Sequence, residues 1–313
     1  MSDKRVALLF SGQGAQTVGM GRDLAAAFPV AADLFKKADA VLGYELSRIA
    51  WEGPEIELTQ TRHCQPALYV HGLACLAALR SVAGHFGVHA CAGLSLGEFT
   101  AHAAAGTFAF EAGLRLVAER GRLMQEACEA SAGGMAAMIG GEEASVVQLA
   151  ADCGVDVANF NSTGQIVLSG EISKIEQAVA LAKERGVRMA KALNVVGAYH
   201  SRLMKPAADK LGAALAEVPM HTPSCMVICN VDADQVSEPV RIRETLQRQV
   251  TGSVRWTQSM ERLVDEEKCD LFLELGPGGV LSGLLSRTRK GVPCLSVTDV
   301  ASIEAAATAL AGV

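Results

Sequence analysis

The heptapeptide GLSLGEF, residues 93–99, places one serine between two glycines, where an apolar run meets a run of small residues. The G-x-S-x-G spacing is typical of a nucleophile elbow, in which a strand turns sharply into a helix and exposes the serine hydroxyl. Residues 88–92 are predicted to form a short buried strand, and residues 97–105 the start of a helix. Both glycines suit such a turn because a side chain at either position would crowd it. Ser95 is therefore a candidate nucleophile, and the backbone N–H of Leu96 is expected where an oxyanion would form.

Strand and helix patterns alternate on both sides of this heptapeptide. Strands are predicted at residues 5–10, 88–92, 225–230 and 271–275, and helices at residues 21–42, 65–82, 97–105, 111–130 and 201–218. Such alternation is typical of a mostly parallel sheet covered by helices. Together with the elbow, it predicts an α/β fold whose larger domain is α/β-hydrolase-like.

The pattern changes after residue 130, at a short run of serine, alanine and glycine. Strands are then predicted at residues 135–139, 155–159, 165–169 and 187–193, with helices at residues 142–153 and 172–185. This β-α-β-β-α-β order is typical of a ferredoxin-like α+β unit. We therefore expect a smaller ferredoxin-like domain at residues 131–198, inserted in a large domain made of residues 1–130 and 199–313.

Composition limits the possible functions of the chain. Half of the 313 residues are hydrophobic and 20% are charged, which is typical of a compact enzyme with a large core. The net charge of −6, without a basic run, argues against nucleic acid or a membrane as partner. No apolar stretch of transmembrane length is expected.

The nine cysteines include no CxxC pair, which indicates buried reduced thiols and a cytoplasmic setting. No pattern suggests an obligate assembly, so we expect a monomer.

A serine nucleophile needs a base, and His200 is the candidate among seven histidines. It follows the last predicted strand of the inserted unit and precedes a helix, a position at the edge of a cleft. Its spacing alone fits a helix-capping or core histidine equally well. His85 and His89 lie near Cys91 but lack a fourth ligand, so no metal site is predicted.

A glycine-containing loop, GQGAQ at residues 12–16, follows the first predicted strand. Thr17 occupies the third glycine position of G-x-G-x-x-G, so the loop is not a dinucleotide fingerprint, and it lacks the Lys-Ser/Thr ending of a P-loop. The carboxyl ends of parallel strands meet at one edge of a sheet. The loop and Ser95 are therefore expected to lie close together.

Seven segments, taken in order along the chain, resemble the malonyl-CoA:acyl carrier protein transacylases. They are GQGAQ (12–16), QPA (65–67), GLSLGE (93–98), ERGRLMQ (119–125), NSTGQIV (161–167), GAYHS (197–201) and GPGGVL (276–281). The resemblance covers nearly the whole chain. It implies an acyltransferase that moves the malonyl group from malonyl-CoA to the phosphopantetheine thiol of an acyl carrier protein, supplying extender units for fatty acid synthesis.

The resemblance also implies roles for individual residues. Ser95 would be the nucleophile that accepts the acyl group, and His200 its general base. The main-chain carbonyl of Gln249 would hold the histidine ring, giving a dyad without an aspartate. The backbone N–H groups of Gln13 and Leu96 would form the oxyanion hole.

The same resemblance implies that Arg120 binds the free carboxylate of the malonyl group and that Asn161 lines the site. A planar guanidinium suits a carboxylate through two parallel hydrogen bonds, although helical periodicity fits Arg115 and Arg122 equally well. No metal or redox cofactor is implied, since the coenzyme A thioester is a substrate. Malonyl-CoA and acyl carrier protein are the implied partners.

The chain departs from the family pattern at two positions. Leu94 precedes the serine where the family often has histidine, and Tyr199 precedes His200 where it often has phenylalanine. The second position is near the acyl pocket, so transfer of another extender, such as methylmalonyl, is an alternative, as is polyketide synthesis. A serine thioesterase or esterase would more often carry an acid that completes a triad. A non-catalytic carrier-binding protein would not need both Ser95 and His200.

Overall fold

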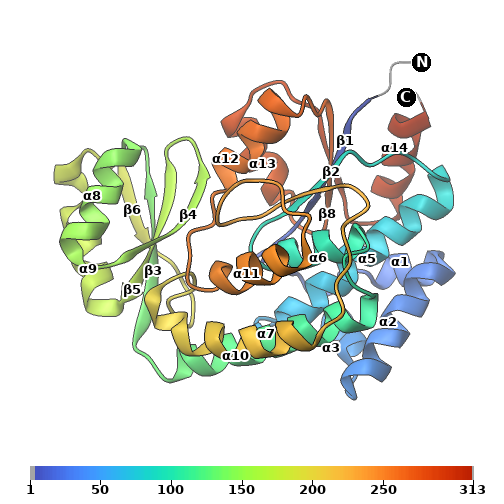
Figure 1. Ribbon diagram of the computed structural model, residues 1–313, viewed down its shortest axis with the longest axis horizontal. Coiled ribbons are helices and arrows are strands. Elements are labelled where there is room, and N and C mark those ends of the chain that lie inside the picture. Colours follow the sequence, from blue (N-terminus) through green and yellow to red (C-terminus); the bar gives the residue numbers. More distant parts are fainter. Residues whose placement is uncertain (1–3, 312–313) are drawn as a thin grey trace.

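Two sheets organise the chain, which is described over residues 4–311 by a computed structural model (Figure 1). The larger sheet has the strand order β7-β2-β1-β8-β9, and every neighbouring pair is parallel. Its strands are β1 (Val6–Phe10), β2 (Ala90–Gly93), β7 (Met226–Ile228), β8 (Leu271–Leu275) and β9 (Cys294–Val297). The predicted parallel sheet is confirmed, and its edge strand β9 is an addition to the prediction.

Helices cover both faces of this sheet because successive residues of its strands point to opposite sides. On β1, Leu8 and Phe10 belong to one core, whereas Ala7 and Leu9 belong to a second core with Trp256. The helices are α1 (Arg22–Ala27), α2 (Pro29–Leu42), α3 (Leu46–Glu52), α4 (Glu55–Leu58), α5 (Thr61–Ala83), α6 (Leu96–Ala104), α7 (Phe110–Glu129), α10 (Lys205–Glu217), α11 (Pro239–Gln249), α12 (Trp256–Glu261), α13 (Val280–Thr288) and α14 (Val300–Ala311).

The second sheet is antiparallel and forms a unit of its own beside the first (Figure 1). Its strands are β3 (Gly133–Ile139), β4 (Asp156–Ser162), β5 (Gln165–Glu171) and β6 (Met189–Ala192), and its helices are α8 (Glu143–Cys153) and α9 (Ile172–Leu181). The strand order is β4-β5-β3-β6, and a separate hydrophobic core fills the space between sheet and helices. The predicted β-α-β-β-α-β order along the chain is present.

Three predicted helices begin or end differently in the structure. The pattern predicts one helix over residues 21–42, but the chain breaks at Phe28, which is extended because a residue before proline avoids the helical region. Helix α5 begins at Thr61 and accommodates Pro66 in its interior, rather than beginning at residue 65. The helix predicted from residue 201 opens with a 3₁₀ turn, Arg202–Met204.

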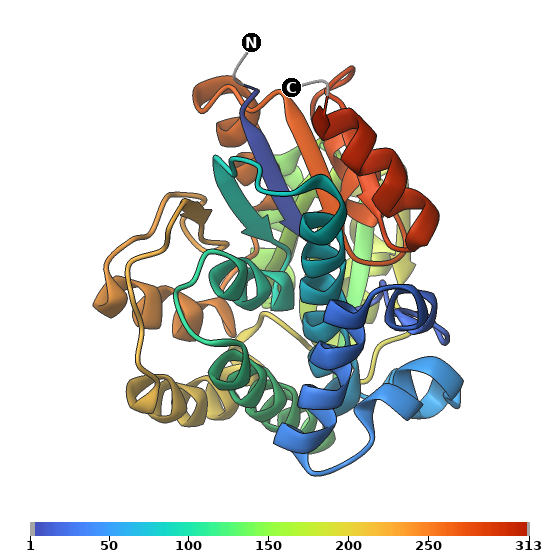
Figure 2. The same cartoon turned by 90° about the vertical axis from the view of Figure 1, so that its right-hand side faces the viewer.

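Helix α5 corrects the expectation that no segment has transmembrane length. By length and composition this 23-residue helix could cross a membrane. Yet 67% of its most apolar window is buried inside the fold, where it contacts α2, α6, α7 and α14. Figure 2 shows it running through the middle of the helical layer. Its apolar character is therefore that of a central core helix.

The parallel sheet determines where the functional loops meet. The GQG loop follows β1, Ser95 follows β2 and Asn230 follows β7. Because β1, β2 and β7 are neighbours in the order β7-β2-β1 and run in the same direction, their carboxyl ends share one edge. This edge carries the candidate site.

Candidate active site

The turn at Ser95 is a nucleophile elbow in its backbone geometry. Ser95 joins β2 to α6 with φ 55° and ψ −104°, a conformation that a residue with a side chain adopts at a cost of about 1–3 kcal/mol. A Cβ added at Gly93 would overlap the carbonyl group of Gly97, and one added at Gly97 would overlap the carbonyl oxygen of Phe10. Strand and helix therefore approach so closely that both flanking residues must be glycine.

His200 forms a dyad with the serine. The Ser95 Oγ atom lies 2.7 Å from Nε2 of His200, and Nδ1 of His200 lies 2.8 Å from the main-chain oxygen of Gln249. A carbonyl oxygen only accepts hydrogen bonds, so Nδ1 carries the proton and Nε2 is left to accept the proton of the serine. His200 also has a positive φ of 55° and is 4% exposed. Both members of the dyad are thus held in strained backbone conformations.

The surroundings of His200 keep its ring neutral. Burial lowers the pKa of His200 to about 4, and the positive charge of Arg120 lowers this pKa as well. The main-chain carbonyls of Gln249 and Gly252 act in the opposite direction because they accept hydrogen bonds that favour the charged ring. At neutral pH the ring is therefore unprotonated and is able to act as a general base.

Arg120 is the arginine of α7 that reaches the serine. Its Nη2 atom donates to Ser95 Oγ at 3.0 Å and to Oε1 of Gln249 at 2.9 Å, and its Nη1 atom donates to Oε1 of Gln65 at 2.7 Å. The guanidinium lies over the ring of Phe99, 5.3 Å from its centroid. Burial lowers the pKa of Arg120 to about 10, so this 1%-exposed side chain remains a cation at neutral pH.

The structure also separates Arg120 from the two arginines that share its helical pattern. Arg122 is exposed and pairs with Glu119 and Glu126 on the surface of α7. Arg115 donates to the main-chain oxygen of Val41 in an exposed contact. Periodicity did not distinguish these three side chains, whereas burial beside the serine does.

Two backbone N–H groups near the elbow have no acceptor within residues 4–311. They belong to Leu96, the first residue of α6, and to Gln13 in the loop after β1. A Cβ at Gly12 would press on the carbonyl oxygen of Leu94, so this loop packs directly against the elbow. Free N–H groups in such a position are suited to bind a developing oxyanion.

The side chain of Asn161 takes no part in the hydrogen bonds around Ser95. It lies in β4, and its Oδ1 atom is buried without a hydrogen-bond partner among the described residues. No hydrogen bond in this part of the chain joins its side chain to Ser95, His200 or Arg120. The hydrogen bonds around Ser95 therefore join His200, Arg120 and Gln249, and none of them involves the side chain of Asn161.

Sequence reasoning missed a buried polar layer beneath the dyad. Oδ1 of Asn230 accepts from the backbone N–H of Ser95 at 2.7 Å, and its Nδ2 donates to the carbonyl of Gly93 at 2.8 Å. Glu98, which is fully buried, accepts from the backbone N–H of Asn230 at 2.9 Å. The signal for Asn230 was its position at the carboxyl end of the strand predicted at residues 225–230. Gln65 and Glu98 belong to the family-like segments QPA (65–67) and GLSLGE (93–98), but no role was predicted for either residue.

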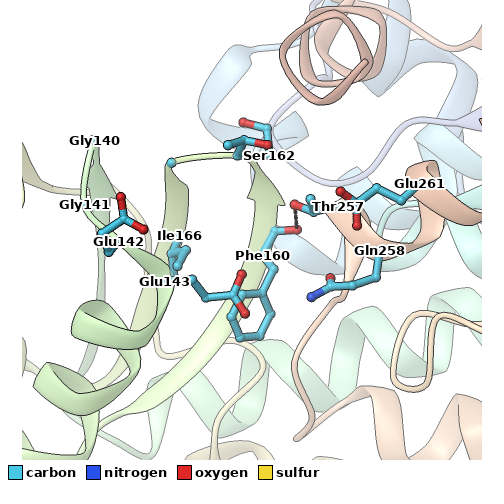
Figure 3. A pocket seen from close by; sticks show the side chains of 12 residues that line it. Gly140, Gly141, Glu142, Glu143, Phe160, Ser162, Ile166, Thr257, Gln258 and Glu261 are labelled. Carbon is cyan, nitrogen blue, oxygen red and sulfur yellow. Dashed lines mark hydrogen bonds between the residues drawn. The ribbon is translucent and has the colours of Figure 1, made fainter.

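A hollow of about 430 Å³ lies away from this site, between the inserted unit and α12 (Figure 3). Phe160 and Ser162 of β4, Glu143 of α8 and Gln258 of α12 contribute to its lining, and no residue of the dyad does. Over residues 4–311, no group of three or more His, Cys, Asp or Glu residues is arranged to hold a metal ion.

Comparison with known proteins identifies relatives over nearly the full length. Residues 7–309 match the family described as the acyl transferase domain. The chain is 39% identical over 306 residues to the malonyl CoA-acyl carrier protein transacylase of Haemophilus influenzae, covering 96% of this chain and 98% of the relative.

Solved structures agree with this similarity. The acyl-carrier-protein-S-malonyltransferase from Bartonella henselae superposes with a TM-score of 0.94 at 38% identity, covering 99% of this chain and all of the other. A malonyl-transacylase in complex with a type II polyketide synthase acyl carrier protein superposes with a TM-score of 0.93 at 38% identity, covering 97% of this chain and 99% of the other.

Proposed function

This chain belongs to the acyl transferase family, and we propose that it is an [acyl-carrier-protein] S-malonyltransferase, which moves the malonyl group of malonyl-CoA to the phosphopantetheine thiol of an acyl carrier protein in fatty acid synthesis. The observation that carries this proposal is the buried Arg120 guanidinium, 3.0 Å from Ser95 Oγ. A cation at that distance suits an acyl group that ends in a carboxylate. An uncharged acyl group would leave the Arg120 guanidinium without an anionic partner.

The first half-reaction forms an acyl-enzyme. Nε2 of His200 takes the hydroxyl proton of Ser95 as Oγ attacks the malonyl thioester carbonyl. The backbone N–H groups of Gln13 and Leu96 bind the oxyanion of the tetrahedral intermediate, a contribution of about 3–4 kcal/mol per donor. When the intermediate collapses, the carbon–sulfur bond breaks and coenzyme A leaves as a thiol with the proton that His200 held. The malonyl group is now an ester of Ser95.

The second half-reaction repeats the same steps with a different nucleophile. His200 takes the proton of the phosphopantetheine thiol, whose sulfur attacks the malonyl-serine ester. The same two N–H groups bind the oxyanion, and the proton returns to Ser95 Oγ as the ester bond breaks. Since coenzyme A leaves before the carrier protein reacts, this scheme is a ping-pong mechanism.

Replacing Arg120 with alanine is expected to lower kcat/KM for malonyl-CoA by about 10²- to 10³-fold, because the substrate carboxylate loses its buried partner. The rate with acetyl-CoA, which has no carboxylate, is expected to change much less. Stopped assays of transfer to holo-carrier protein with both donors measure the two effects. Arg122→Ala is the matched control, since Arg122 lies on the same helix but is exposed.

Two results would contradict the proposed role of Arg120. A serine thioesterase or esterase has no need of a cation beside its nucleophile, so unchanged activity of Arg120→Ala would favour a hydrolase. Equal losses with the two donors would show that Arg120 does not recognise the carboxylate. In both cases the arginine would be a structural residue of α7.

A polyketide pathway is the second candidate, favoured by the structural match to a transacylase in complex with a type II polyketide synthase carrier protein. At Tyr199, the hydroxyl lies 2.7 Å from Oγ1 of Thr61 and accepts from Nε2 of Gln13 at 3.3 Å. The Tyr199 hydroxyl, which phenylalanine would lack, is thus held by Thr61 and Gln13. This supports a pocket that accepts malonyl despite the departure at position 199. Transfer rates to the carrier proteins of both pathways, measured side by side, distinguish the two candidates.

We also infer finer features of the fold, the domain boundaries and the cellular setting. The elbow after β2 supports an α/β-hydrolase-like large domain, and the strand order β4-β5-β3-β6 supports a ferredoxin-like inserted domain. We assign the large domain to residues 1–130 and 199–313 and the inserted one to residues 131–198, with residues 1–3 and 312–313 outside the described part. The nine free cysteines support a reducing, cytoplasmic setting. Asn161 is proposed to line the acyl site.

A further inference from the structure

Glu98 is a buried acid to which the mechanism assigns no step. It lies in the first turn of α6 with no exposed surface. Its Oε2 atom accepts from the backbone N–H of Asn230 at 2.9 Å and from Nε2 of Gln249 at 2.7 Å. Its Oε1 atom has no hydrogen-bond partner among the described residues. A carboxyl group at such a place needs a reason, since burial of an acid is costly.

The contact with Gln249 determines which way that amide points. Nε2 of Gln249 faces three acceptors: Glu98 Oε2 at 2.7 Å, the main-chain oxygen of Ser95 at 2.8 Å and, more distant at 3.3 Å, Oδ1 of Asn230. Its Oε1 atom is thereby turned toward Arg120, whose Nη2 donates to it at 2.9 Å. If the amide were rotated by half a turn, its NH₂ group would face the donor of Arg120 and its oxygen would face the carboxyl oxygen. Two favourable contacts would become two repulsive ones.

We propose that Glu98 is a positioning residue that aims the Arg120 guanidinium at the acyl site by fixing the amide of Gln249. The inference rests on the proposed function, because it concerns recognition of the malonyl carboxylate. Glu98 makes no hydrogen bond to Ser95 Oγ or to His200, and its hydrogen-bonded link to Arg120 runs through the amide of Gln249. The backbone N–H of Asn230 donates to the same oxygen, Oε2, and holds the carboxyl group in place.

The role needs an acceptor at Oε2 rather than a negative charge. Burial raises the pKa of Glu98 to about 7, and the charge of Asp232 also raises it. The donors Asn230 and Gln249 and the charge of Arg120 lower this pKa. In the neutral acid the proton can occupy Oε1, which has no partner, and both bonds to Oε2 remain. Glutamine at this position offers the same acceptor, whereas methionine offers none.

Two substitutions of similar size therefore separate the acceptor from mere space filling. In Glu98→Met, the ratio of kcat/KM for malonyl-CoA to that for acetyl-CoA is expected to fall about 10- to 100-fold, because the Gln249 amide loses its shortest acceptor and is less firmly oriented. In Glu98→Gln, the ratio is expected to stay within about threefold of wild type, since an amide oxygen replaces the carboxyl oxygen. Acylation by both donors and the melting temperature are measured for each variant.

Gln249→Met removes the amide that connects Glu98 to Arg120. It gives a second test that does not depend on the folding of Glu98→Met. The main-chain oxygen that holds His200 is unchanged in this variant, so the general base is kept. The malonyl-to-acetyl ratio of kcat/KM is expected to fall as it does in Glu98→Met, because Arg120 loses the amide oxygen to which it donates. An unchanged ratio in Gln249→Met overturns the proposal. So does an equal loss with both donors in Glu98→Met, which is the result of a purely structural role.

The wild-type enzyme separates this inference from the proposed function. Wild type that transfers malonyl, combined with an unaltered ratio in the variants, overturns the role of Glu98 alone. Wild type that transfers no malonyl in the same assay overturns the proposed function and the inference with it. Equal ratios in Glu98→Gln and Glu98→Met, both lowered, would show that the charge and not the acceptor matters, which also contradicts the proposal.

Discussion

Replacing Ser95 with alanine is expected to lower malonyl transfer by about 10⁴- to 10⁶-fold, the scale seen when a hydrolase loses its serine nucleophile. The hydroxyl is the atom that forms the acyl-enzyme, and neither His200 nor Arg120 is able to replace it in the described geometry. The measurement is the rate at which coenzyme A is released from malonyl-CoA in the presence of holo-carrier protein. The elbow glycines are untouched, so the variant is expected to fold.

Ser259→Ala is the matched control for this substitution. Ser259 is fully buried, whereas Ser95 is half-buried; it lies in α12, and its hydroxyl donates only to the main-chain oxygen of Arg255. Its loss is expected to change stability slightly and leave the rate near that of wild type. If Ser95→Ala kept more than about one-hundredth of the wild-type rate, a loss well below that of a missing nucleophile, the nucleophile would have to be another residue.

Replacing His200 with alanine is expected to lower the rate of acylation by about 10²- to 10⁴-fold, the usual contribution of a general base. Without the ring, the Ser95 hydroxyl keeps its proton while it attacks, although the two oxyanion donors still bind the intermediate. Single-turnover acylation with malonyl-CoA isolates this step from transfer to the carrier. A variant acylated at the wild-type rate would exclude His200 as the base.

The pH dependence of the wild-type enzyme tests the same residue independently. His200 must be unprotonated to act, and burial places its pKa near 4 rather than near the usual 6.5. The value of kcat/KM for acylation is therefore expected to stay level as the pH falls from 8 to about 5 and to decline as it passes through about 4. A decline centred near pH 6.5 would contradict the environment described for this ring.

Much of the fold was predictable because its signals are local. The elbow follows from two glycines around one serine, and close packing of β2 and α6 explains why no other residue fits there. The β-α-β-β-α-β order of the inserted unit follows from short alternating patterns. Element ends were less predictable: Phe28 breaks a long helical pattern because a proline follows it. No element was predicted after residue 279, where α13, β9 and α14 lie.

The residues of the site were predictable only where they belong to a recognisable sequence motif. The patterns alone did not choose Arg120 over Arg115 or Arg122, because helical spacing does not reveal which side chain faces a distant serine. Asn230 and Glu98 were missed for a related reason. Their contacts join α6, α11 and the loop after β7, which are far apart in the sequence and meet only once the parallel sheet has formed.

The central claim is that Ser95 carries a malonyl group between two thiols, and intact-protein mass spectrometry after mixing with malonyl-CoA or acetyl-CoA tests it most directly. We expect one malonyl adduct on the wild-type enzyme, none on Ser95→Ala, and far less adduct with acetyl-CoA at the same concentration and time, since acetyl has no carboxylate for Arg120 to bind. Addition of holo-carrier protein is expected to remove the adduct. No adduct on the wild type and no release of coenzyme A would contradict the account.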